Sequence, residues 1–410
     1  WSMTKVASRF RPYGTTIFAE MTTLANQHGA VNLSQGFPDF DGPQFVQQAA
    51  HDAMARGHNQ YGRMQGVAEL NAALVARFKR SAGLDVDGET QVTVTAGCTE
   101  ALAASFLGLV EPDEEVILFE PYYDCYHVGA TMAGGRVRAV SLRPGQATPV
   151  HGEATPIWAK EAFLFDPDEL RRAFSDKTRI IVVNSPHNPT GKVFTREELA
   201  LIAELCVKHD VIAITDEVYE RLTFEPELPH LHLASFPGMA DRTITLSSLG
   251  KTYSLTGWKI GWAIAPIDLT KAIRAAHQFL TFCAAVPLQH GAAAAILQGE
   301  QEVSALVSRL RAGRDFLGEA LSRLGFTVYK PAGTYFIMVD HSAVGRRLGI
   351  DTPDDVEFCK RLTTQIGVAA IPPSGFYDNP QFGKPLARFA FCKKVQTLEL
   401  AVERLSRLRA

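Results

Sequence analysis

The segment Thr243-Ile-Thr-Leu-Ser-Ser248-Leu-Gly-Lys251 is the clearest indication of the fold class. Its short apolar run is predicted to be a buried strand and ends directly in polar residues. Comparable runs occur at Val116–Phe119, Arg179–Asn184 and Val211–Thr215, and amphipathic stretches such as Arg196–His209 lie between them. This alternation predicts an α/β fold with a mainly parallel sheet covered by helices on both faces. In such sheets ligands bind beyond the carboxyl ends of the strands, so the residues that follow each strand are the candidates for function.

The pattern changes in the last third of the chain. A long helical stretch, roughly residues 292–324, leads into separate short apolar runs, which is typical of a smaller α+β domain. We therefore expect a large domain over residues 41–291 and a small domain built from residues 3–40 and 292–410. Residues 146–163 break the alternation and are expected to form an inserted surface loop.

Composition excludes several classes of protein. The 410 residues are 46% hydrophobic and 21% charged with a net charge of −3, so neither nucleic acid nor an anionic membrane is expected as the main partner. The six cysteines form no CxxC pair, and no secretory leader or membrane-spanning run is visible, which favours a cytoplasmic protein with reduced thiols. His187, His209 and His290 show no metal-ligand spacing, and no metal site is expected.

Polar residues gather at four predicted strand ends. A packed core does not require them, and in a parallel sheet they meet at one edge. They are Cys98 and Thr99, Asn188, Asp216 and Tyr219, and Ser248, Lys251 and Lys259.

This set fits pyridoxal 5'-phosphate (PLP). Lys251 would condense with its aldehyde as a Schiff base, and Asp216 would hold its pyridine nitrogen protonated as an electron sink. Asn188 and Tyr219 would donate hydrogen bonds to the phenolate oxygen, and Tyr123 would stack on the ring.

The phosphate of PLP would lie at the start of the helix predicted at Ala101–Leu109. There the amides of Cys98 and Thr99 point outward at the positive end of the helix dipole. Ser248 and Lys259 would complete the phosphate site.

The sequence resembles the class I/II aminotransferases of the aspartate-aminotransferase fold, and most of all the branch of kynurenine/glutamine transaminases and bacterial methionine aminotransferases. The matching segments lie in family order along the chain: Asn32-Leu-Ser-Gln-Gly-Phe-Pro-Asp-Phe, Asn59-Gln-Tyr-Gly, Glu120-Pro-Tyr-Tyr-Asp-Cys-Tyr, Pro186-His-Asn-Pro-Thr-Gly, Asp216-Glu-Val-Tyr, Ser248-Leu-Gly-Lys through Lys259-Ile-Gly-Trp, and Arg388-Phe-Ala-Phe. The resemblance implies fold type I of the PLP transferases, with a seven-stranded sheet in the large domain. It also implies a homodimer with shared active sites.

The resemblance assigns further roles. Lys251 becomes the general base, and Arg388 grips the substrate carboxylate through its bidentate fork. Tyr61 reaches the phosphate bound by the neighbouring subunit. The residues that line the substrate pocket are Phe18, Gly36, Asn188 and Phe336, together with Phe282 from the partner chain.

Ordinary structural roles remain open for these residues. Lys251 taken alone is a solvated lysine, Asp216 a helix cap and Asn188 a turn residue. Arg388 could make a structural ion pair, and Tyr61 could be an ordinary surface aromatic. Tyr123, Phe18, Phe282 and Phe336 are as compatible with a core as with a pocket, and only the resemblance favours the pocket.

The resulting hypothesis is ping-pong transamination between an amino acid and a 2-oxo acid. An acidic side chain would need a second cation in the pocket, and no arginine stands in a recognisable position for it, so neutral aromatic, sulfur-containing or amide side chains are expected. The alternative is a cysteine-S-conjugate β-lyase, which uses the same lysine and the same cofactor.

Overall fold

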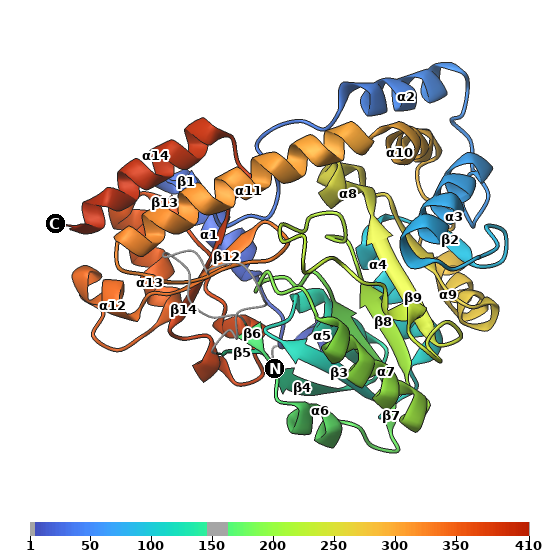
Figure 1. Ribbon diagram of the computed structural model, residues 1–410, viewed down its shortest axis with the longest axis horizontal. Helices are drawn as coiled ribbons and strands as arrows, with labels where there is room; N and C mark the ends of the chain where they lie inside the picture. Colours follow the sequence, from blue (N-terminus) through green and yellow to red (C-terminus); the bar gives the residue numbers. More distant parts are fainter. Residues whose placement is uncertain (1–4, 146–162, 410) are drawn as a thin grey trace.

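The computed structural model describes residues 5–145 and 163–409, and its centre is a seven-stranded sheet (Figure 1). The strand order is β2-β10-β9-β8-β7-β3-β4, and β10 runs antiparallel to both of its neighbours while the other neighbouring pairs are parallel. The predicted mainly parallel α/β sheet is therefore confirmed. The strands are β2 (Val92–Thr95), β3 (Glu115–Glu120), β4 (Arg136–Ser141), β7 (Thr178–Asn184), β8 (Ile212–Asp216), β9 (Thr243–Ser248) and β10 (Gly261–Ile264).

Both faces of this sheet are buried, as continuous apolar strands require. Successive residues of β7 point to opposite faces: Ile180 and Val182 join the core beneath α4 and α9, and Ile181 and Val183 join the core beneath α6 and α7. The helices concerned are α4 (Gly97–Leu109), α5 (Asp124–Met132) and α9 (Ile267–Leu280) on the first face, with α6 (Pro167–Ala173) and α7 (Arg196–His209) on the second.

The helix α7 begins and ends at the residues that the sequence predicted. The Thr195 hydroxyl accepts a hydrogen bond from the amide of Glu198, and the Glu198 carboxylate accepts one from the amide of Thr195, which satisfies two free donors at the helix start. Asp210 ends the helix in the left-handed conformation with φ 54°.

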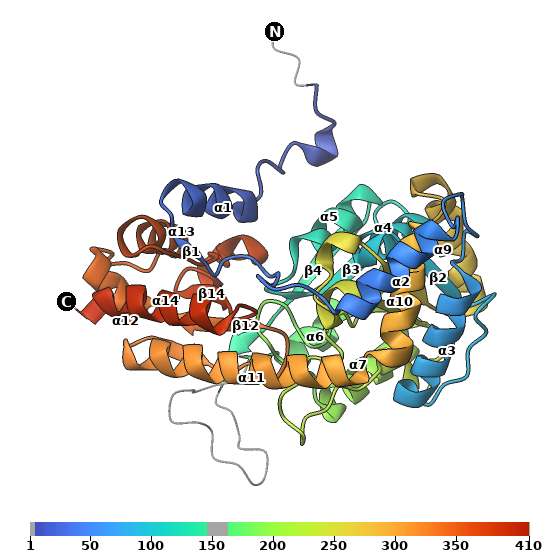
Figure 2. The ribbon, with the colours of Figure 1, turned by 90° about the horizontal axis from the view of Figure 1, so that it is seen from above.

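A second core lies around a three-stranded antiparallel sheet of β11 (Thr327–Tyr329), β12 (Phe336–Asp340) and β14 (Leu386–Ala390). The long helix α11 (Glu300–Arg323) runs beside this sheet and extends to α10 (Val286–Gln298), next to the large sheet's helices (Figures 1 and 2). The N-terminal strand β1 (Val31–Asn32) pairs with β13 (Val368–Ala369), so residues from both ends of the chain build this α+β part. Its helices are α1 (Ile17–Gln27), α11 (Glu300–Arg323), α12 (Ser342–Gly345), α13 (Asp355–Arg361) and α14 (Val395–Leu405).

Three details refine the predicted boundaries. The stretch at 292–324 is two helices, α10 (Val286–Gln298) and α11, which meet at Gly299; the expected domain boundary between residues 291 and 292 falls inside α10. Residues 146–162 of the predicted insertion lie outside the described residues, and Phe163 belongs to β6 (Phe163–Leu164), which pairs with β5 (Arg143–Pro144).

The remaining helices are α2 (Gln44–Ala55), α3 (Ala68–Ala82) and α8 (Leu249–Thr252). None of the described helices has the length and hydropathy needed to cross a bilayer.

Candidate active site

A cavity of about 540 Å³ opens at the carboxyl ends of β7, β8 and β9. The strand register brings these ends together, since Asn184 pairs with Asp216 and Asp216 pairs with Leu246. Residues from the second core close the other side, among them Phe336 and Arg388. Thirteen of the predicted site residues line this cavity: Phe18, Gly36, Cys98, Thr99, Tyr123, Asn188, Asp216, Tyr219, Ser248, Lys251, Lys259, Phe336 and Arg388.

Asp216 is the last residue of β8, and its side chain is held by three donors. Tyr126 donates its hydroxyl to Oδ2 at 2.6 Å, while the amide of Val218 and the thiol of Cys98 donate to Oδ1 at 3.3 and 3.6 Å. Burial raises the pKa of Asp216, and these hydrogen bonds act against the rise. A buried carboxylate fixed in this way presents negative charge to a cationic group in the cavity.

Lys251 lies in α8, one short turn beyond β9. Its Nζ contacts the carbonyl oxygen of Gly36 at 3.5 Å and lies 5.8 Å from the ring centres of both Tyr219 and Tyr335. It forms an ion pair with no carboxylate of the described residues, and burial lowers its pKa. The amine of Lys251 is therefore more readily neutral, and so more readily nucleophilic, than that of an exposed lysine.

An anion site lies at the first turn of α4. This helix starts at Gly97, whose φ of +78° favours glycine, and a Cβ there would lie 3.0 Å from Nζ of Lys259. A Cβ on Gly261 would lie 2.5 Å from the amide nitrogen of Cys98. The two glycines thus keep helix amides and an ammonium group open on one side, and this arrangement fits a phosphate group.

Arg388 is a buried cation in the middle of β14. It is 2% exposed, and it donates to Oδ1 of Asn188 at 3.0 Å and to the carbonyl oxygen of Ser34 at 2.9 Å. Burial lowers its pKa to about 10, which leaves it charged at neutral pH. Its Nε finds no partner in the described residues, and no carboxylate there pairs with it. An uncompensated buried charge is costly, so this guanidinium calls for an anionic ligand.

Aromatic rings form the wall beside Arg388. The ring of Phe336 lies 4.0 Å and that of Phe18 5.3 Å from its guanidinium carbon. A Cβ on Gly36 would lie 2.5 Å from the ring of Phe336, so glycine is required at this wall. Tyr219 is 2% exposed and meets Tyr335 edge to face.

Tyr61 and Phe282 lie outside the lining of the cavity. Their ring centroids are 5.7 Å apart in an edge-to-face contact, and Tyr61 is 87% and Phe282 41% exposed. Both were predicted to act across a subunit interface, and that role stays a prediction.

Comparisons with known proteins agree with this geometry. The sequence profile of the family "Aminotransferase class I and II" matches residues 28–405. The chain is 48% identical to a probable N-succinyldiaminopimelate aminotransferase of Mycobacterium tuberculosis over 97% of each protein, and 39% identical to kynurenine–oxoglutarate transaminase 3 of Mus musculus over 97% of this chain and 89% of that protein. The crystal structure of an Escherichia coli methionine aminotransferase superimposes with a TM-score of 0.89 at 39% identity, covering 98% of this chain and 99% of that one.

The chain belongs to the class I and II aminotransferases. Both the resemblance and the predicted enzyme class are thereby confirmed. Aminotransferases of this family generally depend on PLP. The donor set of this aminotransferase fits that group: an amine of lowered pKa, a buried carboxylate and an anion site kept open by glycines all face one cavity.

Sequence reasoning missed two residues of this aminotransferase that bind other site residues. Tyr126 holds Asp216, and Tyr335 donates its hydroxyl to the carbonyl oxygen of Gly36 at 2.6 Å. A signal for Tyr126 was present, because it follows Tyr123 by three residues and so shares its face of helix α5. Tyr335 adjoins Phe336 in an apolar run and carries no such signal.

Proposed function

We propose that this aminotransferase uses PLP bound by Lys251 to transfer an amino group between a neutral amino acid and a 2-oxo acid. One observation carries the proposal: a half-buried amine, Lys251, and a buried guanidinium, Arg388, have no carboxylate partner among the described residues and face the same cavity as the buried carboxylate of Asp216. An aldehyde, a substrate carboxylate and a cationic ring nitrogen are the three groups that this arrangement suits.

When bound, PLP would supply an electron sink for the charge left by the substrate's α-proton. Asp216 would keep the ring nitrogen protonated, and Tyr126 and Val218 would hold Asp216 in place. Asn188 and Tyr219 would donate to the phenolate oxygen. Cys98 and Thr99 through their amides, and Ser248 and Lys259 through their side chains, would hold the phosphate.

Lys251 would move the proton. Because burial lowers its pKa, its amine is more readily neutral, and a neutral amine takes up the α-proton and then returns it to another carbon. Arg388 would hold the substrate carboxylate, while Phe18, Gly36 and Phe336 exclude water from the side of the substrate that they cover.

The cavity favours substrates with uncharged side chains. Its described lining contains three basic residues, Lys251, Lys259 and Arg388, and the three roles above use all of them. Among the named substrates of the relatives, methionine and kynurenine have uncharged side chains, whereas N-succinyldiaminopimelate carries carboxylates beyond the one at the reacting carbon. The described lining of this cavity has no further cation for such a carboxylate. A panel of donors should therefore give higher kcat/KM for Met, Phe, Gln and kynurenine than for aspartate. Aspartate as the best donor would contradict the proposal, and pyruvate released from a cysteine conjugate without an oxo acid would reveal β-lyase chemistry.

We also propose a cytoplasmic homodimer. The exposed aromatic side chains of Tyr61, Phe279 and Phe282 are the kind of surface that a second subunit covers, and the predicted contacts of Tyr61 and Phe282 require that subunit. The six cysteines are all free, which suits a reducing compartment.

The variant Lys251→Ala tests the cofactor assignment. Loss of both the covalent link and the general base should lower kcat by about 10⁴–10⁶-fold and remove the visible absorbance of the lysine-bound cofactor. Lys271→Ala is the matched control, since that lysine is exposed and pairs with Asp268 on the surface. Substantial turnover by Lys251→Ala with bound cofactor would show that another residue performs the chemistry.

A further inference from the structure

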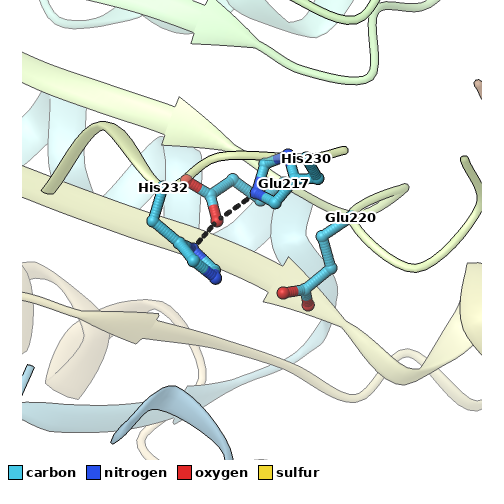
Figure 3. Close-up of side chains that lie close together, drawn as sticks. All are labelled: Glu217, Glu220, His230 and His232. Carbon is cyan, nitrogen blue, oxygen red and sulfur yellow. Dashed lines mark hydrogen bonds and ion pairs between the residues drawn. The ribbon is translucent and has the colours of Figure 1, made fainter. Parts of the chain in front are cut away.

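A second group of ionisable side chains lies on the far side of the catalytic strand ends. Glu217 and Glu220 come from the turn after β8, and His230 and His232 come from the loop that follows (Figure 3). One ligand atom from each of the four lies within 4.8 Å of all the others. No metal site was expected, because His187, His209 and His290 show no ligand spacing. His230 and His232 join Glu217 and Glu220 only when the loop folds back on the turn.

The two imidazoles converge on one atom. Nε2 of His230 and Nδ1 of His232 lie 3.1 and 2.6 Å from Oε2 of Glu217 (Figure 3). The three side chains are buried, with exposures of 7% for His230, 4% for His232 and 2% for Glu217. Such a compact set of nitrogen and oxygen donors, shielded from water, consists of the ligand types that surround a bound zinc ion.

Glu220 supplies a second carboxylate with an oxygen to spare. Its Oε1 accepts hydrogen bonds from Arg77 and from Ser247, the latter at 3.0 Å. In the part of the chain that the structure describes, its Oε2 accepts none. Two carboxylates face a single guanidinium here, so a divalent cation between neutral imidazoles would bring the local charge from −1 to +1.

We propose that these four side chains form a structural Zn²⁺ site. Two imidazole nitrogens and two carboxylate oxygens are ligands that zinc accepts in tetrahedral geometry, whereas Mg²⁺ and Ca²⁺ favour oxygen ligands alone. The four protein ligands complete the tetrahedron, which is typical of a structural rather than a catalytic zinc. The site lies one residue from Asp216, so the ion would clamp the loop at 221–232 to the turn that carries the proposed partner of the cofactor.

The competing explanation is that a proton occupies the cluster. A protonated His232 paired with Glu217 also satisfies both groups without a metal. The two explanations differ in one measurable quantity, the amount of zinc bound per folded chain.

The test uses the cofactor-loaded enzyme, stripped with a chelator and then dialysed against Zn²⁺ at micromolar concentration. Elemental analysis should find about one zinc ion per chain with a Kd below about 1 µM, and zinc should raise the Tm by a few degrees because it binds only the folded state. Co²⁺ in its place should give the intense visible bands of tetrahedral coordination. Absence of bound zinc in the wild-type enzyme would overturn the proposal in favour of the proton.

Variants locate the ion. His232→Asn and Glu217→Gln should each weaken zinc binding by at least about 100-fold and abolish the shift in Tm. The matched control is His51→Asn, which removes a 72% exposed histidine that also lies beside a carboxylate, Asp52, and should bind zinc as the wild type does. Zinc retained by the first two variants would place the ion elsewhere and contradict the proposal. If either variant fails to fold, the wild-type stoichiometry and the Co²⁺ spectrum still decide.

Discussion

The two sides of the catalytic strand ends carry similar residues in opposite states. Asp216 and Ser248 line the cavity, and their chain neighbours Glu217 and Ser247 face the cluster behind it. On the cavity side, Lys251 and Arg388 are cations without a carboxylate partner in the described chain. Behind it, each carboxylate already has partners from this chain.

Charge pairing therefore distinguishes the reactive site from the structural one, although both are buried and charged. Behind the strands, Glu217 contacts two histidines and Glu220 pairs with Arg77, so with neutral imidazoles one negative charge remains. In the cavity the unpaired charges are positive, and a buried cation left in that state costs several kcal/mol unless a ligand supplies the anion. The sign of the unpaired charge therefore distinguishes the cavity, which suits anionic ligands, from the cluster behind it, which suits a cation.

After Lys251→Ala, we expect the strongest loss of activity from Asp216→Asn, which changes the cavity side alone. Loss of the negative charge opposite the ring nitrogen should lower kcat by about 10²–10³-fold, as removal of one preorganised electrostatic contact does. Steady-state kinetics with a saturating donor measures it. The same substitution at the other end of β8, Asp210→Asn, changes a 93% exposed carboxylate and should leave kcat near the wild-type value. Equal losses in both variants would refute the assignment of Asp216.

A pair of adjacent serines sharpens the comparison with a smaller effect. Ser248→Ala removes a proposed hydrogen bond to a charged phosphate, worth about 1.5–3 kcal/mol, and should weaken cofactor binding about 10–100-fold. Ser247→Ala removes a hydroxyl that donates to the charged carboxylate of Glu220 at 3.0 Å behind the strand, and should lower the free energy of unfolding by about 1.5–3 kcal/mol. Cofactor titration by absorbance or fluorescence separates the two. If Ser247→Ala bound the cofactor more weakly than Ser248→Ala, the phosphate would lie on the side of Ser247, contrary to the assignment.

Sequence reasoning predicted the cavity side well and the other side poorly, for a physical reason. Strand ends of a parallel sheet meet at one edge, so polar residues after Asn184, Asp216 and Ser248 are brought together by the fold class alone. The cluster behind them depends on the path of the loop that carries His230 and His232, and no periodicity specifies such a path.

The same limit applies to Arg388 and to the domain boundary. The positive charge of Arg388 was visible in the sequence. Its missing counter-ion among the described residues, and its contacts with Ser34 and Asn188, depend on how the second core docks against the sheet. The break between α10 and α11 was missed because the apolar pattern continues through Gly299. A Cβ at Gly299 would lie 2.5 Å from the carbonyl oxygen of Ala295, so close packing, not pattern, requires the glycine.

The smallest expected effect concerns His187, which adjoins Asn188 as Glu217 adjoins Asp216. His187 is 1% exposed and lies 2.8 Å from the hydroxyl of Thr190, and burial, with a smaller contribution from Lys192, lowers its pKa from 6.5 to about 3. The unfolded chain therefore takes up a proton at higher pH than the folded chain does. The stability that depends on a neutral His187 is complete above pH 6.5 and is lost as the pH falls from there toward 3. At one pH unit below 6.5 the loss is about 1.4 kcal/mol.

The variant His187→Asn lacks this titration, so its stability deficit against the wild type, measured by denaturant unfolding, should be about 1.4 kcal/mol smaller at pH 5.5 than at pH 7.5. A deficit that stays constant over this range would show that the imidazole of His187 accepts a proton without unfolding. His187 would then be less tightly enclosed than the side chains of the cluster around Glu217.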